Sequence, residues 1–277
     1  MFPDLGSQYS FIKEIARGGT GVVHLALDIH TGHLVAIKTL FESMTKTNPE
    51  LLEKFKIESN IYLMLSHPNI VKLKNLILRN GSHLVMEFVD GKTIDQYIQY
   101  LGRPIPYDVC VAMMKDVVSA IGYAHNKKIA IAGYQGVLHL DIKPGNVLIS
   151  KHGEIKIIDY GISNGTNEKR GDKIMGSPMY MAPEQLDLKN ELTNKTDIYS
   201  LGVLFYNMIV GKPPYPKMFT QQEIFNEIRN KPLNPIKLDN LKIQSKIQYI
   251  IDKATRKSPN LRYQSCSEML KDLENVN

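Results

Sequence analysis

The chain has 277 residues, enough for one large domain or for two packed lobes. Hydrophobic residues make up 43% and charged residues 22% of the sequence, which excludes an intrinsically disordered chain. The net charge of +6 comes from scattered lysines and arginines without a basic run, so we expect a solvated basic surface and no nucleic-acid or membrane partner.

The two cysteines, Cys110 and Cys266, lie far apart in segments that are predicted to be helical. This spacing favours free thiols in a reducing compartment over a disulfide framework or a thiolate metal site. The first twenty residues lack the apolar core of a signal peptide, and no window approaches eighteen apolar residues. We therefore expect a cytoplasmic protein.

The first ninety residues are dominated by short, β-rich runs separated by turns. One helix interrupts them: Asn48 and Pro49 are typical of a helix start, and apolar residues follow at largely helical spacing as far as Leu65. The region is predicted to form a five-stranded antiparallel sheet with a single helix, the strands covering residues 9–16, 21–28, 34–40, 70–78 and 82–89.

After Asp90 and Gly91 the pattern changes to long helices. The last of these opens on Ser265 and Glu268, which form a capping-box pattern. Helices are predicted over residues 94–101, 107–125, 196–210, 220–230, 243–255 and 265–273, and short strands over 146–149 and 155–158. The fold class is therefore α+β, with two lobes that meet near residues 87–91 and a cleft between them.

A glycine-rich segment, residues 16–23, lies between the first two predicted strands. Glycines let backbone N–H groups approach phosphate oxygens closely. A plain turn is the alternative, and a dinucleotide site is disfavoured because a strand follows where that site needs a helix.

Two charged residues stand in apolar surroundings: Lys38 in the third strand and Glu58 in the first helix. A lysine alone would extend its amine to solvent, but a carboxylate among apolar positions is costly without a partner. We expect Lys38 and Glu58 to form an ion pair.

Oxygen-bearing side chains cluster in the loop-rich region that follows. Asp141, Asn146 and Asp159 supply the carboxylate and amide oxygens that Mg²⁺ prefers. Aspartate and asparagine are also common in turns, so no single one of these residues predicts a metal site. The prediction of an Mg²⁺ site rests on their combination.

Together, and in this order, these motifs resemble the eukaryotic-type (Hanks-type) serine/threonine protein kinase catalytic domain. The resemblance runs from about Tyr9 to Leu273 and includes the motif HLDIKPGN at residues 139–146, Asp159–Gly161 and Ala182–Glu184. It implies a two-lobed kinase fold as a single domain over residues 1–277. The N-lobe would cover about 1–87, the hinge 87–91 and the mainly helical C-lobe about 92–277.

The resemblance also implies the role of each site residue in transfer of the ATP γ-phosphoryl group. Asp141 would be the catalytic base, Lys143 would neutralise the transferring phosphoryl, and Asn146 and Asp159 would hold Mg²⁺, with Mn²⁺ as an alternative ion. Lys38 would hold the α/β-phosphates and pair with Glu58. The remaining ATP-binding positions would be Ala16, Gly18, Gly19, Gly21, Val23, Ala36, Met86, Glu87, Val89 and Leu148.

Other matching residues are expected to form scaffold. His139, Tyr160, Tyr62 and Leu73 match the internal apolar column of the family. Asp197 matches the helix aspartate that anchors the catalytic-loop backbone, and Glu184 is expected to form a buried pair with Arg262.

Lys143 and Ser177 resemble serine/threonine-specific kinases, in which a hydroxyl at position 177 bridges the base and the lysine. Protein serines and threonines are therefore the expected substrates. One alternative is a pseudokinase scaffold that binds nucleotide or partners without turnover. Another is a small-molecule kinase, which residues 176–184 and Arg262 argue against.

Three positions depart from the family pattern: Ala16 replaces the first loop glycine, Tyr160 replaces phenylalanine, and Leu140 replaces an arginine. That arginine binds phosphate on the activation segment. Because leucine cannot make this contact, we expect an active kinase without the usual phosphate switch. Ser163, Thr166 and Ser177 are the candidate regulatory positions.

The segment 126–137 is several residues longer than the corresponding connection in the family. A lengthened surface turn is the simpler interpretation. Its apolar residues 129–132 leave a docking or dimerisation element as the alternative, so we expect a monomer, with a dimer as the second option.

Overall fold

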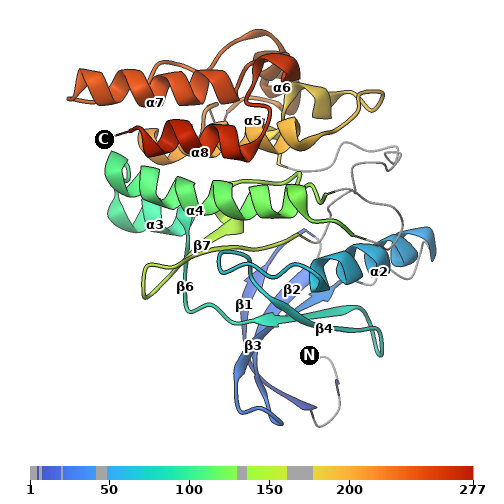
Figure 1. The fold of residues 1–277 in the computed structure, drawn as a ribbon. Helices are drawn as coiled ribbons and strands as arrows, with labels where there is room; N and C mark the ends of the chain where they lie inside the picture. Colours follow the sequence, from blue (N-terminus) through green and yellow to red (C-terminus); the bar gives the residue numbers. More distant parts are fainter. Residues whose placement is uncertain are drawn as a thin grey trace. The chain divides into compact units, whose positions relative to one another are not determined.

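The computed structural model describes residues 5, 8–19, 21–41, 49–129, 136–160, 177–216 and 218–276, with the backbone alone for 49–52 and 54. The chain divides into two compact units, Met1–Asp90 and Gly91–Asn277. Figure 1 shows the helices and strands of both units.

Unit 1 is built on a five-stranded sheet in which every neighbouring pair is antiparallel, in the order β1-β2-β3-β5-β4. The helix α2 packs against β4. The predicted fold class of this region is confirmed. The elements are β1 (Tyr9–Arg17), β2 (Gly21–Asp28), β3 (Leu34–Leu40), α2 (Pro49–Leu63), β4 (Leu73–Ile77) and β5 (His83–Glu87).

The two faces of this sheet differ because side chains alternate along each strand. Tyr9, Ala26, Val35, Ile37 and Val85 pack into a buried apolar cluster. Residues one position away along the same strands, Ala36 and Lys38 among them, point to the opposite face. The sheet thus has one face built for packing and one face that carries the candidate nucleotide residues.

Unit 2 is mainly helical, as predicted, with a small three-stranded sheet in the order β6-β7-β8. β6 (Gly91–Thr93) was not predicted, since three residues are too few to show an alternating pattern. The other elements are α3 (Ile94–Leu101), α4 (Tyr107–Asn126), η3 (Pro144–Asn146), β7 (Val147–Ser150), β8 (Ile155–Ile157), η4 (Pro178–Tyr180), η5 (Pro183–Leu186), α5 (Asn194–Val210), α6 (Gln221–Asn230), α7 (Leu241–Ala254), η6 (Pro259–Leu261) and α8 (Cys266–Glu274).

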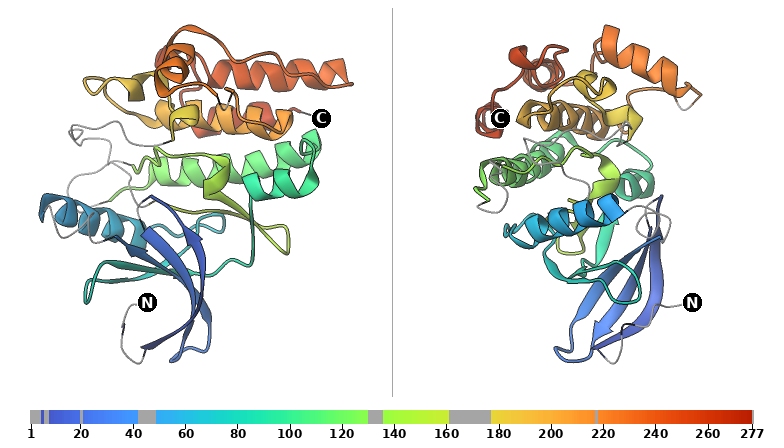
Figure 2. Two further views of the ribbon diagram at one scale, coloured as in Figure 1. Left: turned by 180° about the vertical axis from the view of Figure 1, so that it is seen from behind. Right: turned by 90° about the vertical axis from the view of Figure 1, so that its right-hand side faces the viewer.

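The helix α5 forms the centre of unit 2. It is buried on all sides from Thr196 to Ile209, contacts α4 and α7, and is mostly apolar. Gly211 ends it with φ 73°, and the Gly211 N–H donates to the Asn207 carbonyl at 2.7 Å. α8 lies along α4, which is visible from both sides in Figures 1 and 2.

The predicted capping box of α8 is only half formed. The Ser265 hydroxyl accepts the Glu268 N–H at 3.2 Å, as expected. The Glu268 carboxylate accepts from the Gln264 N–H at 2.8 Å, one residue earlier than the box requires, and pairs with Lys253. No helix of the described residues combines the length and apolarity that crossing a membrane requires.

The predicted Glu184–Arg262 pair is confirmed. The two guanidinium termini donate to the two Glu184 oxygens at 2.6 and 2.8 Å, and both side chains are buried. The remaining guanidinium donors bond the carbonyls of Arg256, Lys257 and Lys195. All five guanidinium donors are therefore used, a pattern that lysine cannot reproduce.

Because loss of one partner leaves the other charge buried and unpaired, Arg262→Met is expected to lower the free energy of unfolding by about 3–5 kcal/mol. The double variant Arg262→Met/Glu184→Gln is expected to recover part of this loss. Urea unfolding measures both, with the exposed Arg103→Ala as control. A loss below about 1 kcal/mol in the single variant would contradict a structural role for the pair.

Candidate active site

Three predicted site residues of unit 2 converge on the Asp141 carboxylate. The Lys143 amine donates to Asp141 Oδ2 at 2.7 Å, and the Asn146 amide donates to the same oxygen at 3.0 Å and to the Asp141 carbonyl at 2.8 Å. The Ser177 N–H donates to Asp141 Oδ1 at 3.1 Å. Asp141 is thus held at both oxygens and remains partly exposed, with 23% of its side chain accessible.

Ser177 differs in detail from the expectation that its hydroxyl bridges Asp141 and Lys143. The hydroxyl accepts from Lys143 at 2.7 Å, whereas the contact with Asp141 is made by the backbone N–H. The lysine therefore links the two residues, and it is fixed between a carboxylate and a hydroxyl.

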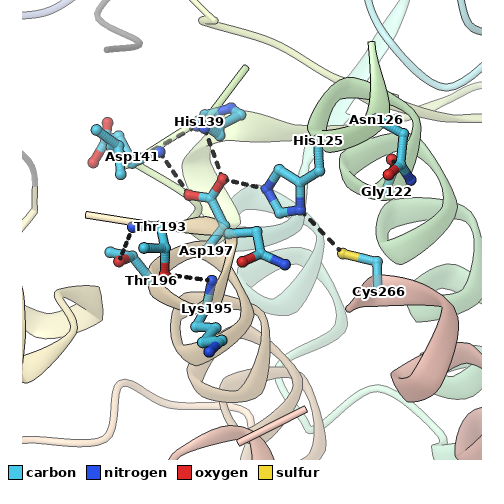
Figure 3. Close-up of polar contacts among 12 residues, drawn as sticks. Gly122, His125, Asn126, His139, Asp141, Thr193, Lys195, Thr196, Asp197 and Cys266 are labelled. Atoms are coloured by element: carbon cyan, nitrogen blue, oxygen red, sulfur yellow. Dashed lines mark hydrogen bonds and ion pairs between the residues drawn. The ribbon is translucent and has the colours of Figure 1, made fainter. Parts of the chain in front are cut away.

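The backbone that carries Asp141 is held in an unusual conformation. Leu140 has φ 62°, in the left-handed region that a leucine rarely adopts. The Leu140 N–H donates to Asp197 Oδ1 at 2.8 Å, and the Leu140 carbonyl accepts from the Gln185 amide at 3.1 Å. The His139 N–H donates to Asp197 Oδ2 at 2.8 Å (Figure 3). These contacts over-determine the strained turn and agree with the anchoring role expected of Asp197.

His125 is a partner of Asp197 that the sequence did not reveal. Its Nε2 lies 2.8 Å from Asp197 Oδ2, and its Nδ1 faces Cys266 Sγ at 3.6 Å (Figure 3). Burial alone would lower the pKa of His125, but the negative charges available at Cys266 and Asp197 outweigh it and raise the pKa to about 10. Burial likewise opposes ionisation of Asp197, yet His125 and the backbone donors bring the Asp197 pKa below its usual value.

Asn146 and Asp159 lie near each other at the ends of η3 and β8. The Ile158 N–H donates to the Asn146 carbonyl at 2.9 Å, and Asp159 follows with φ 64°. The Asn146 amide nitrogen faces Asp141, which leaves the amide oxygen as a ligand atom. An amide oxygen and a carboxylate fit the hard oxygen ligands that Mg²⁺ prefers.

The candidate nucleotide residues of unit 1 share one face of the sheet. Val23 pairs with Lys38, and Ala36 pairs with Met86 across adjacent strands. Cross-strand partners point to the same side, as do residues two apart along a strand. The sheet therefore places the Lys38 amine beside the apolar side chains of Val23, Ala36 and Met86.

The glycine segment closes as a hairpin turn. The Gly18 N–H donates to the Gly21 carbonyl at 2.9 Å, and Ala16 pairs with Val23. A Cβ atom on Gly21 would lie 2.2 Å from the Thr39 carbonyl oxygen, so any other residue would force the strands apart. Gly19 has open space around it.

Lys38 and Glu58 are both buried, with 8% and 6% of their surface exposed. Such burial of two opposite charges agrees with the expected ion pair, which stays a prediction. Among the other predicted positions, Glu87 ends β5, Val89 follows it, and Leu148 lies in β7. Gly161, Ser163, Thr166 and residues 130–135 of the extended segment lie outside the described residues.

The scaffold residues lie as expected within their own units. Tyr62 and Leu73 are buried in unit 1. In unit 2 the rings of His139 and Tyr160 pack with their centroids 4.6 Å apart. His139 is thus a packed residue, since its ring lies against Tyr160 and its Nε2 meets the Ile158 carbonyl at 3.2 Å.

Asp95 is a second residue that the motifs did not reveal. A Cβ atom on Gly145 would lie 3.4 Å from Asp95 Oδ2, which places this carboxylate next to the catalytic loop. Burial raises the pKa of Asp95, and the nearby Lys143 lowers it. Asp95 lies in the first turn of α3, fifty residues before Gly145, so only the fold brings it to the site.

The raised pKa of His125 predicts a pH-dependent contribution to stability. An unfolded histidine has a pKa of about 6.5, so between pH 6.5 and about 10 the folded state binds more protons and the contribution falls as pH rises. The free energy of unfolding lost in His125→Gln should therefore be largest below pH 6.5 and shrink toward pH 10.

Urea unfolding of the protein and of His125→Gln, from pH 6 to about 9.5, measures this difference. Lys257, whose pKa burial lowers to about 8, gives the opposite slope at alkaline pH. Because Lys257 is present in both proteins, its contribution to the free energy of unfolding cancels when the two are compared. A difference that stays constant over the whole range would show that His125 does not titrate in this way.

Comparison with known proteins adds an independent finding. The family model described as "Protein kinase domain" matches residues 9–273. A protein of Clostridium perfringens named as a probable serine/threonine-protein kinase is 31% identical over 98% of this chain and 38% of its own length. The serine/threonine-protein kinase PrkC of Bacillus subtilis is 31% identical over 98% of this chain and 40% of its own length. The chain thus spans about two fifths of these relatives.

Proposed function

The chain belongs to the protein kinase family, and from this premise we propose that it transfers the γ-phosphoryl group of ATP to serine and threonine hydroxyls of proteins. The observation that carries the proposal is the arrangement of Lys143, Asn146 and Ser177 around the Asp141 carboxylate. Phosphoryl transfer depends mostly on positioning and charge stabilisation, and these contacts supply both.

In the proposed reaction, Asp141 accepts the proton of the substrate hydroxyl. The hydroxyl oxygen forms a bond to the γ-phosphorus while the bond from that phosphorus to the leaving oxygen of ADP breaks. Lys143, which donates to Asp141 at 2.7 Å, neutralises charge on the transferring group. Asn146 and Asp159 would hold Mg²⁺, or Mn²⁺ in its place, and the bound ion supplies positive charge to the phosphates.

We assign nucleotide binding in unit 1 to the sheet face that carries Lys38. Val23 and Ala36 would contact the adenine ring, Lys38 would bind the α/β-phosphates, and Glu58 would position Lys38. Residues 1–277 would form one kinase domain, with an N-lobe to about 87, a hinge at 87–91 and a C-lobe from 92. The division between Asp90 and Gly91 supports this organisation.

The proposed substrate class is supported by two observations. Lys143 bonds the Ser177 hydroxyl, the contact expected of serine/threonine-specific kinases. The relatives of C. perfringens and B. subtilis carry that specificity in their names. We further propose that the chain acts as a monomer in the cytoplasm, without nucleic acid, on the basis of its free cysteines and scattered charge.

A pseudokinase scaffold is the alternative function. It is disfavoured because Lys38, Glu58, Asp141, Asn146 and Asp159 are all present, and in unit 2 Asn146 and Lys143 already contact the base. Turnover distinguishes the two functions.

Replacing the base gives the decisive test. Asp141→Asn is expected to lower transfer of radiolabelled phosphate from ATP to a generic protein substrate by a factor of about 10² or more, because the amide cannot accept the proton. Asp108→Asn, an exposed aspartate on α4, is the matched control. A wild-type protein that binds ATP and transfers no phosphate would favour the scaffold.

We also propose that activity does not require phosphate on the activation segment. The Leu140 side chain carries no charge, while the backbone at Leu140 is held by Asp197 and Gln185 without any phosphate. The base is thus positioned by groups that are permanently in place.

The double variant Ser163→Ala/Thr166→Ala tests this proposal. It should keep its rate within about threefold of wild type, since no arginine at position 140 requires a phosphate partner. Phosphate transfer to the same substrate measures the rate, and mass spectrometry verifies that the segment is unmodified. Loss of nearly all activity would overturn the proposal.

A further inference from the structure

A small pocket of about 190 Å³ lies in unit 2 where α4 ends and where α5 and α8 begin. Most of the residues that line it are polar, among them Asn126, Thr193, Asn194 and Ser265. Cys266 and His125 also line it. Asn126 and Glu191 at the pocket are exposed, so solvent reaches it.

The Cys266 thiol is the end of a chain of three ionisable groups. Its Sγ lies 3.6 Å from His125 Nδ1, and His125 Nε2 lies 2.8 Å from Asp197 Oδ2 (Figure 3). The carboxylate fixes the imidazole so that its second nitrogen faces the sulfur. This is the relation of nucleophile, base and orienting group that activates a cysteine.

Two further features lie next to the Cys266 sulfur. It is the first residue of α8, where the helix dipole stabilises negative charge. The facing imidazole also has a raised pKa and therefore carries a proton at neutral pH. A cysteine beside a cationic histidine at a helix start has the environment of a reactive thiol.

Gly122 lets Cys266 pack closely against α4. A Cβ atom at position 122 would lie 2.9 Å from the Cys266 Cβ and 3.9 Å from its Sγ. A side chain at position 122 would therefore push Cys266 away from its present position.

Cys110 and Cys266 are both buried, but Cys266 lines the pocket and Cys110 does not. Cys110 is fully buried, its thiol donates to the Ile105 carbonyl at 3.4 Å, and burial raises its pKa far above the usual range. A buried thiol of this kind is inert. Cys110 is therefore an internal control for the reactivity of Cys266.

We propose that Cys266 is a modification site that forms a mixed disulfide with small disulfides bearing polar, amino-acid-like groups, and that this adduct slows phosphoryl transfer. The Cys266 thiolate attacks one sulfur of the disulfide, a new S–S bond forms and the old one breaks. The leaving thiolate takes up a proton from the solvent, and no net oxidation occurs beyond the exchange. The polar side chains that line the pocket match such a partner.

The effect on the site follows from the same chain of contacts and rests on the proposed kinase function. An adduct on Cys266 fills the space beside His125 and separates the sulfur from the imidazole. His125 then shifts from Asp197, the group that also holds the N–H donors of His139 and Leu140. A shift of the catalytic loop by about 1 Å can reduce turnover by about 10².

The first experiment measures the modification without reference to kinase activity. The native chain is incubated with glutathione disulfide, and the adducts are located by peptide mass spectrometry. One adduct at Cys266 is expected, with Cys110 unmodified until urea unfolds the protein. Equal rates at both cysteines in the native protein would overturn the proposal.

Two variants test the role of the surroundings. His125→Gln should slow the reaction at Cys266 by about tenfold, because the thiolate loses its cationic partner. Asn126→Trp, at the exposed edge of the pocket, should slow the reaction at Cys266 by obstructing access. This variant provides the test if His125→Gln does not fold. A rate unchanged in every folded variant contradicts the proposed site.

The second experiment measures phosphate transfer before and after thiolation, each protein being compared with its own untreated sample. Wild type should lose activity by about tenfold or more and regain it with dithiothreitol, whereas Cys266→Ala should not respond. Full activity of the thiolated protein overturns the proposed inhibition. If the untreated wild type has no activity, the kinase proposal is refuted instead. The modification of Cys266 is still tested by the labelling experiment, which does not depend on activity.

Discussion

The arrangement of unit 2 depends on one buried carboxylate, that of Asp197. It has no exposed surface, so its charge is sustained only by the groups around it: the His125 imidazole and the N–H donors of His139 and Leu140. Burial of this charge is costly, and movement of the loop would remove the N–H donors that compensate it. The desolvation cost therefore fixes the position of the loop backbone at His139 and Leu140. Asp141 directly follows Leu140 in the sequence, so its position is fixed by the same contacts.

The same turn of α5 organises the segment after Ser177. Thr196, one residue before Asp197, donates its hydroxyl to Glu184 at 3.0 Å, and Ser200 donates to the Tyr180 carbonyl at 2.8 Å. Glu184 is in turn bound by Arg262. Neighbouring residues of one buried helix thus hold both the catalytic loop and the segment that supplies Ser177, which explains how Lys143 can meet Asp141 and Ser177 together.

The sequence predicted most of the elements and the residues around Asp141, because periodicity and motif order are local properties. It missed contacts between distant positions: His125 and Cys266 are 141 residues apart, and Asp95 meets Gly145 only in the fold. The prediction that the Ser177 hydroxyl contacts Asp141 was wrong, because the backbone N–H of Ser177 makes this contact. The sequence does not show which of the two groups of a serine faces a distant carboxylate. The three residues of β6 were too few to predict.

Leu140 shows why a change within a catalytic motif need not reach the chemistry. Its left-handed backbone is held through its N–H and its carbonyl, and every residue type offers these same two groups except proline. The side chain is therefore free to vary without moving Asp141. An arginine at this position would add a charge that requires a partner, whereas leucine adds only apolar surface. The backbone of the loop is thus held by Asp197 and Gln185 through groups that do not depend on the side chain at position 140.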